Sequence, residues 1–347
     1  MIEVLKQNKE LFDLFTRREE YSSLLLDRYQ RFPYYLSRYR NILEPEVSKF
    51  LIENGLKVEY PDGKKFAVCL THDIDAVNFP RFFGIYNAAI SLIHGRIKNA
   101  LKMPFYKINK NWNPWWNFKE IMALEEKYGA KSSFYFLALN KEDLDSNYKI
   151  EDLEHEIGDI ADNGWEVGLH GGHEAYYNLD EIKKEKKRLE KVIGRKVIGY
   201  RNHCLKFKVP ATWELLSKAD FKYDSTFGYA DCVAFRNGMC HPFKPFNLDT
   251  NKEIDILEIP LTIMDCTLFE YMKLDIDEAW KLTKALISTV ERYNGIITIL
   301  WYNTYMFDEK LNFYKLILKY CNEKNAWMTS GEEIWKLWNE NNVQYHS

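Results

Sequence analysis

The fold of this chain is constrained most by a regular alternation of short β-rich runs with amphipathic helical patterns, which begins after residue 60. The β-rich runs predict strands at 66–71, 133–137, 166–169, 197–201, 256–263 and 296–301. Apolar residues at helical spacing predict helices at 118–128, 150–163, 180–193, 210–219, 277–293 and 308–323, with a last strand and helix at 326–338. Strands separated by such helices are joined by right-handed crossovers. The sequence therefore predicts an α/β fold with a parallel sheet or barrel.

The first sixty residues follow a different pattern. Apolar residues recur at helical intervals within 3–55, which predicts two or three helices, and the turn Pro61-Asp62-Gly63 closes this segment. A chain of 347 residues is long for one domain, but α/β barrels with insertions reach this size. We expect an N-terminal helical extension at 1–60 and a barrel at 61–347, with an insertion at 76–119.

Composition excludes several classes of protein. Hydrophobic residues make up 46% and charged residues 29%, which suits a large core, and a net charge of −3 excludes a globally basic nucleic-acid binder. The N-terminus lacks the uninterrupted apolar run of a signal peptide, and no stretch of the chain is apolar enough to span a membrane. Six scattered cysteines without a CxxC pair are typical of free thiols. We expect a cytoplasmic protein.

Polar residues stand at or just after the ends of the predicted strands. They are Asp73, Asp75, His170, His173, Arg201, His203, Asp265, Tyr302 and Asn303. The carboxyl ends of parallel strands form the face on which α/β barrels assemble their active sites. This placement predicts an enzyme.

Asp73 and Asp75 are two residues apart, so in extended backbone both carboxylates point to the same side. Such a pair also occurs in turns and helix caps. With His170 on a neighbouring strand end, one aspartate and two histidines can bind Zn²⁺ or a similar ion. The second aspartate is then free to deprotonate a water on that ion. The glycines Gly171-Gly172 allow close backbone approach there, or simply form a tight turn.

Six segments follow one another in a characteristic order: THDID, WEVGLHGGHEAY, GYRNHCLKF, YDSTFGYAD, EIPLTIMD and ILWYN. Together they resemble the successive motifs of the polysaccharide deacetylase (NodB-homology, carbohydrate esterase) family. The branch with THDVD-like, LHGSY-like, GYRNHYL-like and LWHN-like segments is the most similar. The resemblance covers about residues 64–330 and implies an irregular (β/α) barrel of the polysaccharide-deacetylase type.

The resemblance also implies an activity. The family uses a metal-bound water to remove acetyl groups from N-acetylated sugars, so the expected cofactor is a divalent metal, here zinc. Carried over by position, Asp73 resembles the general base, Asp75 the carboxylate ligand and His170 the first histidine ligand. Arg201 resembles the arginine that orients the base, through a bidentate pair with Asp73.

The second histidine ligand is ambiguous. The commonest family pattern places it four residues after the first, where this chain has Glu174. His203 is favoured because it ends a neighbouring strand and the similar branch has a histidine there, while His173 is the alternative. The histidine that is not a ligand would bind substrate or lie on the surface. His72 is expected to support the site from behind the ligands.

The proton donor departs from the family pattern. The LWHN-like motif supplies a histidine that protonates the leaving amine, and this chain has Tyr302 at that position. A phenol with a pKa near 10 donates a proton less effectively than imidazole near pH 7. Asp265 can take part in proton transfer or only bind substrate. A slow enzyme and a binding-only barrel both fit this substitution.

The predicted insertion at 76–119 is basic and aromatic and contains no acidic residue. Its basic residues are Arg81, Arg96, Lys98, Lys102, Lys107, Lys110 and Lys119. Such a segment suits an anionic membrane surface, a phosphate-bearing glycolipid or a nucleotide sugar. It equally suits an aromatic lid over the barrel mouth with solvated lysines.

The sequence therefore predicts a cytoplasmic metal-dependent deacetylase of an N-acetylated polysaccharide, glycolipid or nucleotide sugar, with peripheral contact to an anionic membrane through 76–119 as one option. One alternative is a catalytically inactive barrel that binds carbohydrate or a partner protein. Another is a hydrolase of a different amide. A serine hydrolase is disfavoured because the chain has no GxSxG motif.

Overall fold

The computed structural model describes residues 1–79, 113–340 and 343–345. Its central strands are β2 (Ala67–Ile74), β3 (Ser133–Leu137), β4 (Glu166–Gly171), β5 (Gly199–Asn202), β6 (Tyr223–Asp224), β9 (Leu257–Glu258), β10 (Leu261–Met264), β11 (Ile296–Leu300) and β12 (Trp327–Thr329). They form one parallel sheet in the order β10–β11–β2–β3–β4–β5–β6–β9. β12 and β3 share one edge of β2, because β12 pairs with its first residues and β3 with its last. The predicted parallel α/β architecture is confirmed.

The sheet curls into an irregular barrel because its two end strands follow each other in the chain. β9 and β10 are separated only by Ile259 and Pro260. Proline has no backbone N–H to donate to a sheet, so a strand is interrupted where it occurs. The single strand predicted at 256–263 is therefore wrong in detail: the structure has two short strands at opposite ends of the sheet order.

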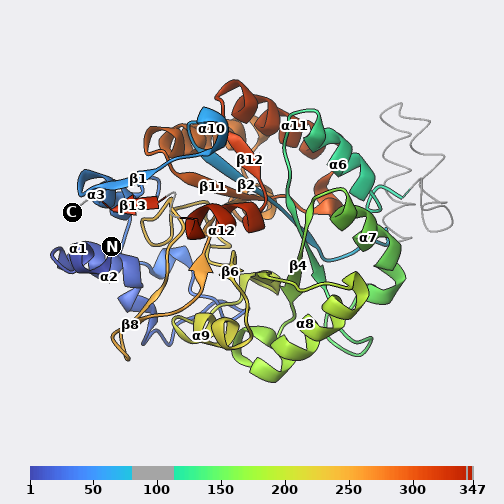
Figure 1. The fold of residues 1–347 in the computed structure, drawn as a ribbon, viewed down its shortest axis with the longest axis horizontal. Coiled ribbons are helices and arrows are strands. Elements are labelled where there is room, and N and C mark those ends of the chain that lie inside the picture. Colours follow the sequence, from blue (N-terminus) through green and yellow to red (C-terminus); the bar gives the residue numbers. More distant parts are fainter. Residues whose placement is uncertain (80–112, 341–342, 346–347) are drawn as a thin grey trace.

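Helices cover the outside of the sheet (Figure 1). They are α6 (Phe118–Glu126), α7 (Glu154–Asp162), α8 (Leu179–Ile193), α9 (Ala211–Lys218), α10 (Ile276–Arg292), α11 (Asp308–Glu323) and α12 (Gly331–Asn339). Local sequence fixes several ends. The Asn178 side chain caps the first turn of α8, and Gly194 ends that helix in a left-handed conformation with φ 72°. Asp275 and Glu278 form a capping box at the start of α10.

The N-terminal segment contains α1 (Ile2–Leu5), α2 (Lys9–Thr16) and α3 (Glu46–Glu53). Between α2 and α3 there are only two short 3-10 turns, so the expectation of helix across 3–55 holds only at the two ends of this segment. Leu5, Phe15 and Leu51 are buried in the same apolar cluster as the barrel strands. The fully buried Arg17 donates to the backbone carbonyl of Arg236 at 2.8 Å, which joins the extension to the barrel.

Three features of the sheets were not predicted from the sequence. They are the strand β6, a hairpin of β7 (Phe246–Asn247) and β8 (Lys252–Glu253), and the pairing of β1 (Leu56–Val58) with β13 (Val343–Tyr345). Most of the predicted insertion, including its basic residues from Arg81 to Lys110, lies outside the described residues. Its lipid-facing or lid role stays a prediction. Within the described ranges, no helix is long and apolar enough to cross a membrane.

Candidate active site

β2 carries the aspartate pair. The strand extends to Ile74, three residues beyond its predicted end, so Asp73 lies on the strand and Asp75 directly follows it. Both carboxylates approach the same imidazole nitrogen, Nε2 of His170, at 3.7 Å from Asp73 Oδ2 and 3.1 Å from Asp75 Oδ1. The two side chains therefore face one site, as their spacing predicts.

His170 lies on β4 and is fully buried. Its Nδ1 lies 3.1 Å from the backbone carbonyl oxygen of Arg201, which can only accept a hydrogen bond. Nδ1 must therefore carry the proton in the neutral ring, and the lone pair is on Nε2, which faces the two aspartates. Histidine ligands of metals are oriented by this kind of hydrogen bond on the far nitrogen.

His203 opens the 3-10 turn that follows β5. Its Nδ1 lies 3.4 Å from Asp75 Oδ1 and 3.2 Å from His170 Nε2. One ligand atom from each of Asp75, His170 and His203 lies within 4.8 Å of the others. We call these three residues the inner set. The structure thus brings together the three residues expected as ligands, and it places the alternative, His173, outside them.

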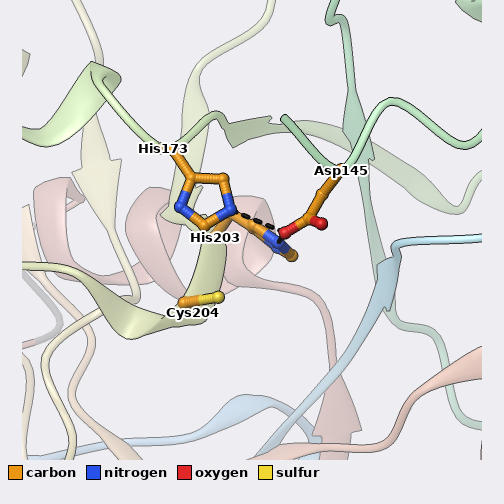
Figure 2. A group of neighbouring side chains, drawn as sticks. All are labelled: Asp145, His173, His203 and Cys204. Atoms are coloured by element: carbon orange, nitrogen blue, oxygen red, sulfur yellow. Dashed lines mark hydrogen bonds and ion pairs between the residues drawn. The ribbon is translucent and has the colours of Figure 1, made fainter. Parts of the chain in front are cut away.

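A carboxylate that the sequence analysis did not single out lies on the far side of His203. Asp145 Oδ2 is 3.1 Å from His203 Nε2 and 2.6 Å from His173 Nε2, and Figure 2 shows the carboxylate beside both rings. Hydrogen bonds from His203 and His173 hold the pKa of Asp145 well below its usual range. Asp145 lies in the loop after β3 but eight residues beyond the strand end, so strand-end position alone does not mark it.

The charges around the aspartates differ. Burial raises the pKa of Asp73, and His170 and Arg201 only partly oppose it. Burial would also raise the pKa of Asp75, but His203 and His170 outweigh burial and lower that pKa well below its usual range. For His203, Asp75 and Asp145 overcome burial and raise the pKa well above its usual value. In this structure, the two imidazoles therefore offset the effect of burial more fully at Asp75 than at Asp73.

Arg201 lies beside Asp73 but does not form the bidentate pair that we expected. Its Nε is 3.7 Å from Asp73 Oδ1, too far for a hydrogen bond, and its Nη2 donates to Ser225 Oγ at 2.9 Å. The guanidinium is fully buried and lies 5.1 Å from the centre of the Tyr135 ring. The hydroxyl of Ser225 and the ring of Tyr135 hold it to one side, so it acts on Asp73 as a buried charge.

The inner set fits a metal ion. Within the described residues, both oxygens of Asp73 and Oδ1 of Asp75 are buried without a hydrogen-bond partner. A buried polar atom without a partner is costly, and a bound ion or its water can satisfy it. One carboxylate and two imidazoles are a donor set typical of Zn²⁺ and related divalent ions.

Asp265 and Tyr302 form the other side of the barrel mouth. Asp265 follows β10 and accepts hydrogen bonds from the backbone N–H groups of Cys266 and Tyr302. Burial nevertheless raises its pKa to about 8. The Tyr302 hydroxyl lies 3.9 Å from Met264 Sδ, and burial, with Asp75 and Asp73 adding to it, raises the pKa of the phenol well above its usual range.

His72 is buried on the face of β2 opposite Asp73. Its Nδ1 lies 2.6 Å from the backbone carbonyl oxygen of Trp301, and its Nε2 lies 2.8 Å from Glu125 on α6. Neither partner belongs to the inner set. His72 fastens the ends of β2 and β11 to a helix, and the expectation that it stands directly behind the ligands is wrong.

A cavity of about 560 Å³ lies beside His173. Its lining includes the carboxylates of Glu142, Asp143, Glu174, Glu181 and Glu185. The rings of Tyr176 and Tyr177 also line it, together with Lys206. Glu174, which replaces the family's second histidine, therefore lies in this acidic wall and not among the inner set. Cavities of this size hold small ligands.

Comparison with known proteins supports the architecture. A protein of Mycobacterium smegmatis assigned as a polysaccharide deacetylase superimposes with a TM-score of 0.55 at 18% identity, over 80% of this chain and 92% of that one. The chain has the polysaccharide deacetylase fold. A second such protein, from Pseudomonas aeruginosa PAO1, gives 0.56 at 12% identity over 82% and 95% of the two chains.

The fold is not confined to proteins assigned as sugar deacetylases. PuuE allantoinase superimposes with a TM-score of 0.55 at 12% identity, over 88% of this chain and 99% of that one. No protein-family model and no curated protein matches the sequence. At these identities the likeness concerns the fold, so the residues of the site must carry any conclusion about function.

Proposed function

We propose that this chain is a metal-dependent deacetylase that removes the acetyl group from an N-acetylated sugar. The observation that carries the proposal is the convergence of Asp75, His170 and His203 next to Asp73, whose two carboxylate oxygens are buried without a partner among the described residues. A divalent ion such as Zn²⁺, when held by the inner set, supplies an acidified water and polarises the amide carbonyl.

Asp73 is the proposed general base. It approaches His170 only at 3.7 Å, so it remains available to take a proton from an attacking water. Burial raises its pKa toward the range in which a carboxylate accepts protons effectively. His170 and the buried charge of Arg201 limit that rise.

The proton for the leaving nitrogen must come from the other side of the mouth. Tyr302 and Asp265 are the two candidates there. A phenol with a raised pKa keeps its proton but releases it reluctantly, whereas a carboxyl group with a pKa of about 8 is mostly protonated at neutral pH. We place Tyr302 first because both oxygens of Asp265 already accept backbone hydrogen bonds.

The acidic cavity beside His173 constrains the sugar. Burial raises the pKa of Glu185 to about 7, but the carboxylates of Glu142, Asp143, Glu174 and Glu181 also line this cavity and repel phosphate or carboxylate groups. The part of the substrate that enters the cavity is therefore neutral or cationic. The tyrosine rings offer flat faces on which a sugar ring can pack. We therefore favour an N-acetylated oligosaccharide or polysaccharide over a substrate whose phosphate would occupy this cavity.

A second candidate function is a catalytically inactive barrel that binds carbohydrate, and the observation that favours it is Tyr302 in place of histidine. The direct test measures acetate release from N-acetylated oligosaccharides and from a nucleotide-linked N-acetyl sugar, and allantoate formation from allantoin. Protein stripped by a chelator is compared with protein reloaded with Zn²⁺, with Asp75→Asn as the control. Acetate release from the oligosaccharides, only after reloading, is the expected result. Sugar binding without acetate release under every metal tested would favour the binding protein.

A further inference from the structure

A second group of potential metal ligands lies on the outer side of His203. It consists of Asp145, His173, His203 and Cys204, whose ligand atoms all lie within 4.8 Å of one another, and we call it the outer set (Figure 2). We propose that the outer set is a second divalent-metal site, at the rim of the barrel mouth. It takes a borderline or soft ion such as Zn²⁺, Co²⁺ or Cd²⁺.

The donor atoms decide this choice of ion. The outer set combines one thiol, two imidazoles and one carboxylate, which is a four-ligand combination that suits tetrahedral Zn²⁺. Hard ions such as Mg²⁺ and Ca²⁺ prefer oxygen ligands and are poorly served by a thiolate. The inner set contains no sulfur, so ligation by Cys204 distinguishes the two sites chemically.

Three neighbouring strand ends build the outer set. Asp145 lies in the loop after β3, His173 follows β4, and His203 and Cys204 follow β5. Side chains elsewhere fix the backbone here: Arg31 Nη1 donates to the carbonyl of Cys204 at 2.8 Å, and Lys206 Nζ donates to the carbonyl of His173 at 3.2 Å. The ligands are thus held in place by contacts that metal binding does not need to break.

Asp145 already brings the two imidazoles together. Its Oδ2 lies 2.6 Å from His173 Nε2 and 3.1 Å from His203 Nε2, and the two rings lie 4.9 Å apart, centre to centre. With 45% of its side chain exposed, Asp145 lies where an ion from solvent can reach it. An ion would replace the protons that these hydrogen bonds now share, which is the usual exchange when imidazoles become ligands.

His203 belongs to both sets, and this couples the two sites. Its Nδ1 faces the inner set and its Nε2 faces the outer set. A neutral imidazole has one lone pair, so His203 serves one ion at a time. With the inner site filled, the outer ion keeps Asp145, His173 and Cys204. Each ion therefore weakens the binding of the other by the same factor, and an excess of metal opposes the inner site.

Cobalt titration of the full chain tests the proposal, because a thiolate ligand gives Co²⁺ a charge-transfer absorption that nitrogen and oxygen ligands do not. Four proteins are compared after chelator treatment under a non-chelating reductant: wild type, Cys204→Ser, His170→Ala and, as a matched control, Cys232→Ser. Cys232 is also a partly buried free thiol, and it belongs to neither set. Wild type should bind two equivalents and show the thiolate band.

The variants separate the two sites. Cys204→Ser should lose the band and at least tenfold in affinity for one equivalent, whereas His170→Ala should keep the band and lose the other equivalent. Cys232→Ser should match wild type. One equivalent without the band in wild type, or an unchanged band in Cys204→Ser, would overturn the outer site. One equivalent with the band would retain the outer site and reject the inner one. If Cys204→Ser does not fold, His173→Gln should weaken the band in its place, and an unchanged band would overturn the proposal.

Discussion

The two sides of the barrel mouth differ in how far their polar groups satisfy one another. On the side built by β2, β4 and β5, the inner set converges while the oxygens of Asp73 have no hydrogen-bond partner among the described residues. On the side built by β10 and β11, both oxygens of Asp265 are taken by backbone N–H groups. Among the described residues, the Tyr302 hydroxyl makes a long contact, of 3.9 Å, to Met264 Sδ.

This difference indicates which steps the two sides can support. The first side suits a ligand that is not protein, because within the described residues the buried oxygens of Asp73 and Oδ1 of Asp75 have no hydrogen-bond partner. The second side carries Tyr302, which departs from the family pattern, and Asp265, whose carboxylate already accepts hydrogen bonds from backbone N–H groups. Metal binding and general-base catalysis are therefore separable from proton donation to the leaving group, and variants should show this separation.

The largest expected effect is a difference between variants of the two aspartates, Asp73 and Asp75, on the β2, β4 and β5 side of the mouth. Asp73→Asn should keep the inner metal and lose about 10²–10⁴-fold in turnover, since general-base catalysis contributes that much. Asp75→Asn should lose the metal as well, because Asp75 Oδ1 lies 3.1 Å from His170 Nε2 and 3.4 Å from His203 Nδ1. Metal content and acetate release are measured on the same preparations. If Asp73→Asn sheds the metal while Asp75→Asn keeps it, the two roles are reversed.

The next effect concerns the buried carboxyl group of the second side. Burial raises the pKa of Asp265 to about 8, although the backbone N–H groups of Tyr302 and Cys266 oppose this rise, whereas an unfolded aspartate titrates near 4. Between these values the native state holds a proton that the unfolded chain has released. The free energy of unfolding therefore falls as pH rises, by up to about 1.4 kcal/mol per pH unit.

Asp265→Asn removes this dependence. The variant itself is less stable if its amide N–H₂ faces a backbone N–H. The informative quantity is therefore the difference in the free energy of unfolding between variant and wild type. Urea unfolding should show that difference shifting in favour of the variant by up to about 3 kcal/mol from about pH 5 to about pH 7. A difference that does not change with pH would show that Asp265 is ionised throughout, and would remove it as a proton donor.

The smallest effect concerns Tyr302. Tyr302→Phe should lower turnover about tenfold and leave metal affinity unchanged, because a weak acid contributes little to proton transfer. Tyr302→His should equal or exceed wild type, with its pH optimum nearer neutrality, since imidazole titrates near 6.5. Tyr305→Phe is the control, as the Tyr305 hydroxyl bonds to Glu270 outside the site. Unchanged turnover in Tyr302→Phe would move the donor to Asp265.

Much of the fold was predictable from hydrophobic periodicity. The strand at 133–137 and the helix at 308–323 match the structure to the residue. Periodicity gave the wrong strand where a single residue interrupts the backbone pairing. The apolar run 256–263 reads as one strand, but Pro260 breaks it and moves its halves to opposite ends of the sheet order. β6 has only two residues, too few for a period to be visible.

The site residues that lie at the ends of predicted strands could be predicted from the sequence. Asp73, Asp75, His170 and His203 do meet, because parallel neighbours bring their carboxyl ends to one edge. Asp145 was missed because it lies in a polar loop eight residues after β3, in a left-handed conformation with φ 63° that no periodic pattern reveals. The open geometry of the Arg201–Asp73 pair depends on Ser225 and Tyr135, which are distant in sequence.

The central claim is that the β2, β4 and β5 side of the mouth is a metal centre. Equilibrium dialysis against limiting Zn²⁺ tests it, using wild type, His170→Ala and the control His155→Ala, whose side chain is 75% exposed and remote from the inner set. Wild type and His155→Ala should bind Zn²⁺ alike, and His170→Ala should bind it at least about 100-fold more weakly at the inner site, as expected when one of three protein ligands is lost. Equal zinc affinity in all three proteins would contradict the account.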